Sequence, residues 1–507
     1  MAMSKIDFYQ ETLTEEQLAS PHILLKVLQS VRHAVMRDGT EIFEQWRSLI
    51  ERKAFIPSSV NLAYYLAFRR HDMREIQLSL IPWGLSSLGR IEARVLPNLD
   101  GVIATLGALC GQDQTFLPKH PPLKAFFEGD RLLKSHTDEV FGHPPESREV
   151  RIMVTLPTTA ATDFELILDL IKRGTDCFRI NCAHDTKTEW EAMINHIREA
   201  EKVLEKTCKI LMDLGGPKIR LDHVLLPNGK KRIYQGDGLL LTRNEPQTPD
   251  EVYFKANCTL PEIFDQLQIG ATVWIDDGHI GATVKELIPE GALLRIDHAR
   301  PKGEKLRPDK GINFPDTTLD LNPLTEKDRQ DLDFVATHAD LIGYSFVQKA
   351  SDIEILQWEL KNRLGKDWQK VAIIAKIETP TAVKNLPELI IHGAGKQPFG
   401  VMIARGDLAV EIGYQRLAEM QEEILWLCQA AHVPVIWATQ VLENLVKNSI
   451  PSRAEMTDAA MGERAECVML NKGKFVGEAV TTLDGVLSRM EAHQSKKTPQ
   501  LRALHSW

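Results

Sequence analysis

Two opposite charges stand close together at the end of one apolar run. In "VAIIAKIETP" (371–380), Lys376 and Glu378 are two residues apart and Pro380 follows them. Residues i and i+2 of a β-strand point to the same side, so a strand here would aim both side chains in one direction. Burying either charge unpaired is costly. A site that binds a divalent cation and a phosphate group accounts for both residues, and an ion pair that closes the strand end is the alternative.

Comparable residues end other apolar runs of the chain. They are Arg179, Asn181 and His184 after one run, Asp213, Lys218 and Arg220 after the next, and Arg405, Gly406, Asp407, Thr439 and Gln440 after two later runs. Glu378 and Asp407 could together hold Mg2+, which takes few carboxylates and leaves room for substrate oxygens. Lys376 could neutralise a phosphoryl group during its transfer. The residue types therefore indicate metal-assisted phosphate chemistry.

Eight short apolar runs predict the elements that position these residues. They are "VRIMVTL", "CFRINCA", "KILMDLG", "LIGYSFV", "AIIAKIE", "GVMIARG", "PVIWATQ" and "CVMLNK". A segment with helical spacing follows seven of them, and two of these helices are expected to open with capping boxes, Thr162…Glu165 and Ser351…Glu354. Continuous apolar strands are typical of parallel sheets that are covered on both faces. The pattern predicts an α/β fold, a (β/α)8 TIM barrel, whose functional residues meet at the carboxyl ends of the strands.

The remaining segments predict two additions to this barrel. Residues 1–148 read as an N-terminal all-α domain because apolar residues recur at helical spacing. The barrel is expected over 149–220 and again over 311–495. Between these two parts, 221–310 contains short alternating stretches broken by Gly, Pro and Asn, which predict a small inserted β-barrel lid domain. Residues 496–507 are expected to form a C-terminal tail.

Composition argues against several classes of protein. The net charge is −9, whereas nucleic-acid binders usually carry a basic excess, so we expect no nucleic-acid partner. No apolar run reaches the roughly 18 residues that a membrane helix needs, so we expect no membrane association. The first residues, "MAMSKIDFYQETLTEEQ", lack the apolar core of a signal peptide. The seven cysteines form no C-x-x-C pair, which fits buried thiols in a reducing compartment. These features predict a cytoplasmic protein.

The strings at the strand ends, taken in order, resemble the pyruvate kinase family. "FRINCAHD" looks like its second-strand arginine–asparagine motif, and "MDLGGPKIR" and "IDDGHI" resemble its third strand and its lid. "DKGINFPD", "LTEKDRQDLDF", "AKIET", "MIARGDLAVEI" and "WATQVLENLVKNSIPSRAEMTDAA" continue the match. The resemblance covers roughly residues 150 to 490. It implies Mg-dependent transfer of a phosphoryl group from phosphoenolpyruvate to ADP, giving pyruvate and ATP.

The resemblance also implies a role for each residue of the expected rim. Lys376 would stabilise the phosphoryl group and the developing enolate, and Glu378 and Asp407 would bind Mg2+, for which Mn2+ could substitute. Substrate would be held by Arg179 and by Ala404, Arg405, Gly406, Asp407 and Thr439, and Thr439 would also begin the proton relay to the enolate. Nucleotide would be bound by Asn181, His184, Arg220 and Lys310. A packing or capping role for His184 is the alternative.

The sequence departs from the family at its usual K+ pocket. That pocket uses Asn, Ser, Asp and Thr, and the matching residues here are Asn181, Ala183, Asp213 and Leu214. Two oxygen ligands are therefore missing. Lys218 stands where K+-dependent members have glutamate, and its ammonium could lie near Asp213 in place of the ion. We therefore expect no requirement for K+.

Other departures leave alternatives for the function. The loop after the eighth strand is "NKGKFVGEAV", which puts the identity of the phosphate donor or acceptor in doubt. A C-terminal regulatory domain is not expected, and the N-terminal domain is expected to cover a barrel face or a subunit interface of a homo-oligomer. A lyase that acts on a pyruvate enolate, or a regulatory protein that binds phosphoenolpyruvate without turnover, remain as other hypotheses. "DDGHIG" (276–281) is expected to be a structural turn, although the resemblance implies that its aspartate approaches the site when the lid closes. "RRHDMR" (69–74) is expected to be a solvated face or helix cap, or a contact with the barrel or a partner.

Overall fold

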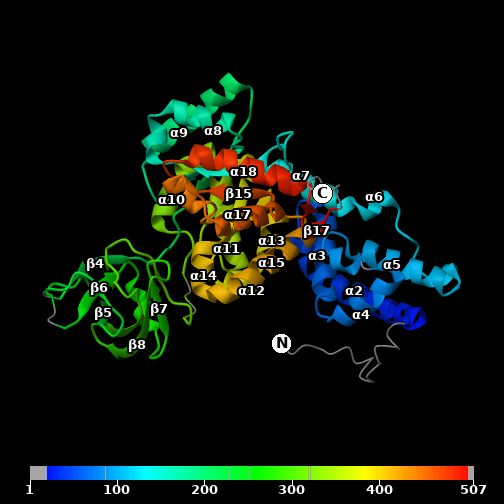
Figure 1. Ribbon diagram of the computed structural model, residues 1–507, viewed down its shortest axis with the longest axis horizontal. Coiled ribbons are helices and arrows are strands. Elements are labelled where there is room, and N and C mark those ends of the chain that lie inside the picture. The colour runs from blue at the N-terminus through cyan, green and yellow to red at the C-terminus, as the bar shows by residue number, and fades with distance from the viewer. Residues whose placement is uncertain are drawn as a thin grey trace.

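The computed structural model describes residues 20–85, 87–227, 229–249, 252–317, 319 and 321–500. A central barrel is flanked by N-terminal helices on one side and by a second sheet on the other (Figure 1). Within these residues, no helix is both long and apolar enough to cross a membrane.

The eight expected runs form one closed parallel barrel. The strands are β1 (Arg151–Thr155), β2 (Cys177–Asn181), β3 (Lys209–Asp213), β11 (Leu341–Tyr344), β12 (Ala372–Ile377), β13 (Phe399–Ala404), β14 (Val435–Ala438) and β15 (Cys467–Leu470). Their order around the barrel is β1-β15-β14-β13-β12-β11-β3-β2, so each strand lies beside its neighbours in the chain apart from the insertion after β3. The predicted α/β barrel is confirmed.

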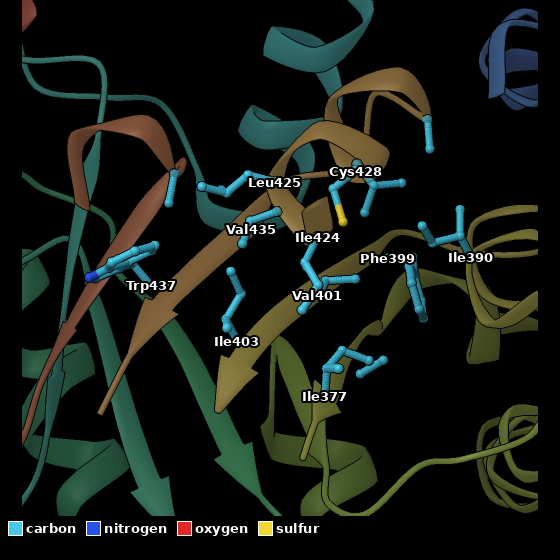
Figure 2. Packing of buried hydrophobic residues seen from close by; sticks show 14 of the residues in the cluster. Ile377, Ile390, Phe399, Val401, Ile403, Ile424, Leu425, Cys428, Val435 and Trp437 are labelled. Carbon is cyan, nitrogen blue, oxygen red and sulfur yellow. The ribbon is translucent and has the colours of Figure 1, made fainter. Parts of the chain in front are cut away.

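Helices cover the outside of the barrel. They are α8 (Phe164–Lys172), α9 (Lys187–Leu204), α10 (Glu326–His338), α11 (Ala350–Leu364), α12 (Pro380–Lys384), α13 (Leu386–Ala394), α14 (Arg405–Ile412), α15 (Tyr414–Ala430), α16 (Glu443–Asn448), α17 (Arg453–Met461) and α18 (Val476–Glu491). The core lies between these helices and the strands. Figure 2 shows Val401, Ile403 and Val435 of the strands facing Ile424, Leu425 and Cys428 of α15, all at most 4% exposed. Such burial fixes where the strand ends lie.

Both predicted capping boxes are wrong by one or two residues. At α8 the cap is Asp163, whose carboxylate accepts a hydrogen bond from the Leu166 backbone N–H at 3.0 Å. At α11 the cap is Lys349, and the Asp352 carboxylate accepts from its backbone N–H at 2.9 Å. In both places an aspartate near the first turn provides the acceptor, because a carboxylate also favours the positive end of the helix dipole.

The N-terminal helices form a layer against the barrel. They are α2 (Pro21–Trp46), α3 (Ile56–Phe68), α4 (Arg74–Leu80), α5 (Val95–Leu109), α6 (Leu123–Phe126) and α7 (Glu128–Phe141). The Asn61 amide donates to the Ala430 carbonyl at 2.8 Å, and the Arg52 guanidinium donates to the Gln397 carbonyl at 2.9 Å. These contacts confirm that the N-terminal region covers a barrel face.

The end of α7 closes the barrel at the amino ends of its strands. Val140 and Phe141 are each 1% exposed and pack with the barrel-interior side chains Met153 and Leu211. The Cys177 thiol donates to the Phe141 carbonyl at 3.6 Å, which ties α7 to the start of β2. The N-terminal region therefore supports the end of the barrel opposite the expected functional rim.

A buried histidine joins the N-terminal layer to the barrel and should make stability depend on pH. The His432 ring contacts the Ser58 hydroxyl at 2.9 Å and the Ala93 carbonyl at 3.1 Å, and its own carbonyl lies 2.7 Å from His136 Nδ1. Burial lowers the pKa of His432 from 6.5 to about 4. Between these values the unfolded chain binds more protons than the folded chain, so stability present above pH 6.5 is lost as the pH falls towards 4.

We expect this loss to amount to about 3 kcal/mol from His432 alone. Denaturant unfolding of the wild type and of His432→Asn, measured at several pH values in that window, isolates the contribution. Asparagine tolerates the left-handed backbone at this position, where φ is 51°. The variant should be less stable at neutral pH and should lose less stability on acidification. Parallel pH profiles for the two proteins would contradict the assignment.

The segment between β3 and α10 forms a separate sheet. Its strands are β4 (Leu221–Leu225), β5 (Gly238–Thr242), β6 (Phe254–Cys258), β7 (Thr272–Ile275), β8 (Ile280–Ile288), β9 (Gly291–His298) and β10 (Ile312–Asn313), in the order β10-β7-β8-β9-β5-β6-β4. It has its own apolar core. We call it the inserted domain; it lies on the side of the barrel away from the N-terminal helices (Figure 1).

Candidate active site

A cavity of about 440 Å3 opens at the carboxyl ends of the barrel strands. Most of the side chains expected on the rim line it: Arg179, Lys218, Lys376, Glu378, Ala404, Arg405, Gly406, Asp407, Thr439 and Gln440. The inserted domain adds Asp277, and the loop after β15 adds Asn471. Within the described residues, nothing from the N-terminal helices lines this cavity. The strand ends thus bring together the cations, carboxylates and hydroxyl that the sequence predicted there.

Lys376 is held in a fixed position on β12. Its side chain is only 11% exposed, and its ammonium donates to the Ser345 hydroxyl at 2.7 Å. The ammonium also lies 3.4 Å from Asp213 Oδ1 and 3.3 Å from Glu378 Oε1. Burial lowers the pKa of Lys376, but the two carboxylates outweigh it and the net pKa is raised. A charged lysine is therefore stable at this rim.

Asp213 lies behind the cavity wall and orients two cations. It is 1% exposed, and it accepts a hydrogen bond from Arg179 Nε at 2.8 Å. A second Arg179 nitrogen donates to the Thr155 hydroxyl at 3.2 Å. Burial favours the neutral acid, yet Lys376 and Arg179 outweigh it and lower the pKa of Asp213. One buried carboxylate thus fixes both side chains that could face a phosphate.

Glu378 is a buried carboxylate that could bind a cation. It is 2% exposed, and one of its oxygens accepts from the Phe346 backbone N–H at 2.6 Å. Phe346 has a φ of 56°, an unusual backbone for a bulky residue, and this conformation turns its N–H towards Glu378. Burial raises the pKa of Glu378 in spite of the nearby Lys376. A bound cation would stabilise its ionised form.

Lys218 has a different partner from the one that was expected. Its ammonium donates to Asp407 Oδ1 at 2.7 Å and lies 3.9 Å from Asp277 Oδ1. Among the described residues, the expected contact between Lys218 and Asp213 is not found, because Arg179 and Lys376 already flank the Asp213 carboxylate. Lys218 therefore connects the barrel rim to the inserted domain.

The Thr439 hydroxyl is presented by a strained turn. Thr439 and Gln440 have φ values of 73° and 58° directly after β14, which is costly for a β-branched residue. The Arg405 guanidinium stabilises this turn by donating to the Ala438 and Thr439 carbonyls, each at 2.7 Å. A Cβ on Gly406 would lie 2.9 Å from Thr439 Cγ2, so only glycine leaves room for the threonine.

The four side chains expected to bind nucleotide lie outside this cavity. Asn181 Oδ1 accepts from the Ala183 N–H at 3.1 Å, Arg220 donates to the Asp309 carbonyl at 2.9 Å, and Lys310 pairs with Asp276 at 2.7 Å. Burial, with Lys472 adding to it, lowers the pKa of His184. Arg220 and Lys310 belong to the inserted domain or its entry, so the structure places them beside the rim and not within it.

Sequence reasoning missed several supporting residues. Ser345 stands at the end of β11 and donates to the Leu214 carbonyl at 2.8 Å while accepting from Lys376. Asp458 of α17 pairs with Arg405. Asp277 belongs to the turn that was expected to be structural, yet it lines the cavity, and the Tyr414 hydroxyl donates to its carbonyl at 3.3 Å. Two of them carried a signal: Ser345 lies within the predicted strand "LIGYSFV", and Asp277 lies in "IDDGHI", which resembles the family's lid.

The charges around the cavity balance in pairs. Arg179, Lys376 and Lys218 face Asp213, Glu378 and Asp407. The described residues contain no group of three or more His, Cys, Asp or Glu side chains able to hold a metal. Two carboxylates suffice for Mg2+, which usually keeps water and phosphate oxygens as its other ligands. The arrangement suits a phosphorylated substrate bound together with a divalent cation.

Comparisons with known proteins agree with this chemistry. The family described as pyruvate kinase, barrel domain, matches residues 147–480. The chain is 33% identical to the pyruvate kinase of Methylorubrum extorquens over 68% of this chain and 69% of the relative. It is 31% identical to the pyruvate kinase of Agrobacterium vitis, over 69% of each chain, and 30% identical to pyruvate kinase PKLR of Rattus norvegicus, over 73% of this chain and 66% of the relative. About a third of each relative's length lies outside the match.

Proposed function

Since the chain belongs to the pyruvate kinase family, we propose that it transfers a phosphoryl group from phosphoenolpyruvate to ADP, giving pyruvate and ATP. The observation that carries this proposal is the buried Lys376, whose ammonium is held by Ser345, Asp213 and Glu378 at the cavity floor. A fixed cation of this kind stabilises charge that develops on a transferring phosphoryl group.

Each residue of the cavity has a part in the proposed reaction. Arg179 binds the phosphate of phosphoenolpyruvate, and Asp213 keeps its guanidinium in place. Lys376 neutralises the phosphoryl oxygens as the bond between phosphorus and the enol oxygen breaks and an oxygen of ADP bonds to phosphorus. It then faces the enolate that remains. The substrate carboxylate is held by the backbone at Ala404, Arg405 and Gly406, where α14 begins and N–H groups are free to bind an anion.

A proton must reach the enolate carbon to give pyruvate. Thr439 delivers it from its side of the cavity as the first member of a proton relay, and its hydroxyl takes a proton in turn from water. The Arg405 guanidinium holds the turn that carries Thr439 by donating to the Thr439 carbonyl. Glu378 and Asp407 would hold Mg2+, or Mn2+ in its place, which when bound adds positive charge beside the phosphoryl oxygens. Nucleotide is bound by Asn181, His184, Arg220 and Lys310, at the border between the barrel and the inserted domain.

A coupled assay tests the function directly. Pyruvate formation is measured with phosphoenolpyruvate and several nucleoside diphosphates, with and without Mg2+. We expect turnover that needs a nucleoside diphosphate and Mg2+. Binding of phosphoenolpyruvate without pyruvate formation would favour a regulatory protein, and pyruvate formed from a carbon–carbon cleavage substrate would favour a lyase. The loop after β15, which brings Asn471 to the cavity, makes the choice of diphosphate an open outcome of the same assay.

The proposed enzyme should work without K+. Ala183 and Leu214 lack the oxygen ligands of the family's K+ pocket, and Lys218 places a fixed cation beside Asp407. In Na+- and K+-free buffer with a bulky organic counter-ion, activity should stay within about threefold of that in K+, a barrier difference below about 1 kcal/mol. Lys218→Glu should lower activity, and K+ should restore it only when Ala183→Ser and Leu214→Thr are added. Strong K+ activation of the wild type would refute the proposal.

The protein is proposed to act in the cytoplasm as a homo-oligomer. The N-terminal helices expose several large apolar side chains, namely Leu78, Ile81, Trp83, Leu109, Phe116 and Leu123, each at least 41% exposed. Apolar surface of this kind favours contact with another copy of the chain. Light scattering of the purified protein gives the number of subunits, and a monomer at micromolar concentration would contradict this part of the proposal.

A further inference from the structure

A second cavity lies between the N-terminal helices and the barrel, away from the candidate active site. Its volume is about 450 Å3. The turn from α3 to α4 contributes Arg69 and His71, the entry to α5 contributes Glu92, and α15 contributes Trp426. Lys497 comes from the C-terminal hairpin, which β16 (Gln494–Ser495) and β17 (Thr498–Pro499) form. Arg69 and His71 belong to the segment 69–74 that was expected to be a solvated face or a contact. The stacking of Arg69 on Trp426 shows that it contacts the barrel.

Buried polar atoms in this cavity have no protein partner. Among the described residues, Glu92 Oε2, Trp426 Nε1 and both ring nitrogens of His71 are buried and make no hydrogen bond. Glu92 is only 2% exposed. An unsatisfied buried polar group costs on the order of 1–3 kcal/mol, and native proteins contain few of them. Their concentration around one cavity favours a bound water or ligand that supplies the missing partners.

The free groups are held firmly in place. The other oxygen of Glu92 accepts from the Lys497 ammonium, and the Glu92 carbonyl accepts from the Asn61 amide at 2.7 Å. The Lys497 ammonium lies 4.8 Å from the Trp426 ring centroid, and the Arg69 guanidinium lies 5.1 Å from it. The indole is thus fixed by two cations, and the carboxylate by an ion pair and its backbone. A site whose groups are oriented before binding loses little entropy when a ligand arrives.

The free groups define the chemistry of the ligand. Glu92 Oε2 accepts a hydrogen bond and so requires a donor, whereas Trp426 Nε1 donates and so requires an acceptor. Arg69, Arg70, Arg74 and Lys497 line the cavity together with only two carboxylates, Asp72 and Glu92, so its lining carries a positive excess. Arg74 pairs with Asp72 and Arg70 lies 3.7 Å from Asp38, which leaves Arg69, beside Trp426, as the arginine without a carboxylate partner among the described residues. We propose that this cavity binds a small organic anion that also carries hydroxyl groups, with its hydroxyl donating to Glu92 and its acidic group facing Trp426 and the arginines.

Calorimetric titrations of the full chain with four probes test the proposal. Glycerol 3-phosphate and glycerate carry both an acidic group and hydroxyls, whereas inorganic phosphate lacks the hydroxyl-bearing carbon chain and glycerol lacks the charge. We expect at least one of the first two probes to bind at least about tenfold more tightly than phosphate or glycerol. Binding by glycerol 3-phosphate alone would assign a phosphate, and binding by both a shared anion site. Equal affinities for all four probes, or no binding of any of them, would overturn the proposal.

Two variants locate the binding. Trp426→Phe keeps the aromatic ring and removes the N–H, and Glu92→Gln keeps the size and replaces the free acceptor with an amide. Each should weaken the probe at least about tenfold. Trp358→Phe, at a site that is 60% exposed on α11, is the matched control and should change nothing. A probe that binds at the active site would have the same affinity for Trp426→Phe as for the wild type. Unchanged affinity in both cavity variants would therefore refute this site and leave the proposed function untouched.

Discussion

Lys376→Met should abolish phosphoryl transfer while the barrel stays folded. The ammonium of Lys376 is the only cation of β12 that lines the cavity among the described residues, and methionine fills a similar volume without charge. Loss of one fixed electrostatic stabiliser usually costs about 10²–10³ in rate, and in the proposed reaction the lost cation would face a group that carries several negative charges. We expect kcat to fall by at least about a thousandfold in the coupled assay.

Stability and a matched variant separate this effect from misfolding. The substitution leaves Asp213 and Glu378 with one cation fewer, so a lower melting temperature is expected, but Arg179 still pairs with Asp213 and the apolar core is unchanged. Circular dichroism should show a folded protein. Lys384→Met, on the exposed end of α12, should retain full activity. Turnover near the wild-type rate in Lys376→Met would remove this residue from the mechanism.

The barrel could be predicted because each of its strands is a short apolar run that can be recognised from the local sequence. "AIIAKIE" is a continuous apolar run with its charged residues at one end, and β12 occupies residues 372–377 of it. Continuous apolar strands need cover on both faces, and eight strand–helix units within one domain favour a closed barrel. The rim residues followed directly, since they are the polar residues nearest each strand end.

Contacts between distant segments could not be predicted in the same way. Phe141 closes the barrel from a helix that precedes the first strand, and nothing in its local pattern distinguishes it from an ordinary core residue. Lys218 was expected near Asp213 because the two are close in sequence, but the path of the chain into the inserted domain carries it to Asp407. The cavity at Trp426 combines four segments, one of them the C-terminal hairpin. Pairings of this kind depend on packing and not on periodicity.

The loss of either proposed metal ligand should raise the Mg2+ concentration that the enzyme requires. In Glu378→Gln, the amide oxygen can still accept from the Phe346 N–H, so the loop stays in place while the charge is lost. In Asp407→Asn, the same change is made on α14. Loss of a group that merely supports a metal ligand already costs about 10–100-fold in affinity, so we expect each variant to need at least tenfold more Mg2+ for half-maximal activity.

Asp407 requires a further control because it also pairs with Lys218. If Asp407 acted only by holding Lys218, then Lys218→Gln would reproduce the effect of Asp407→Asn on the Mg2+ titration. If Asp407 is a metal ligand, Lys218→Gln should leave the Mg2+ requirement unchanged or lower it, because the substitution frees a carboxylate oxygen that the ammonium now occupies. Direct binding of Mn2+, followed by electron paramagnetic resonance, gives a readout that does not depend on turnover. Wild-type Mn2+ affinity in both carboxylate variants would show that the metal is held elsewhere.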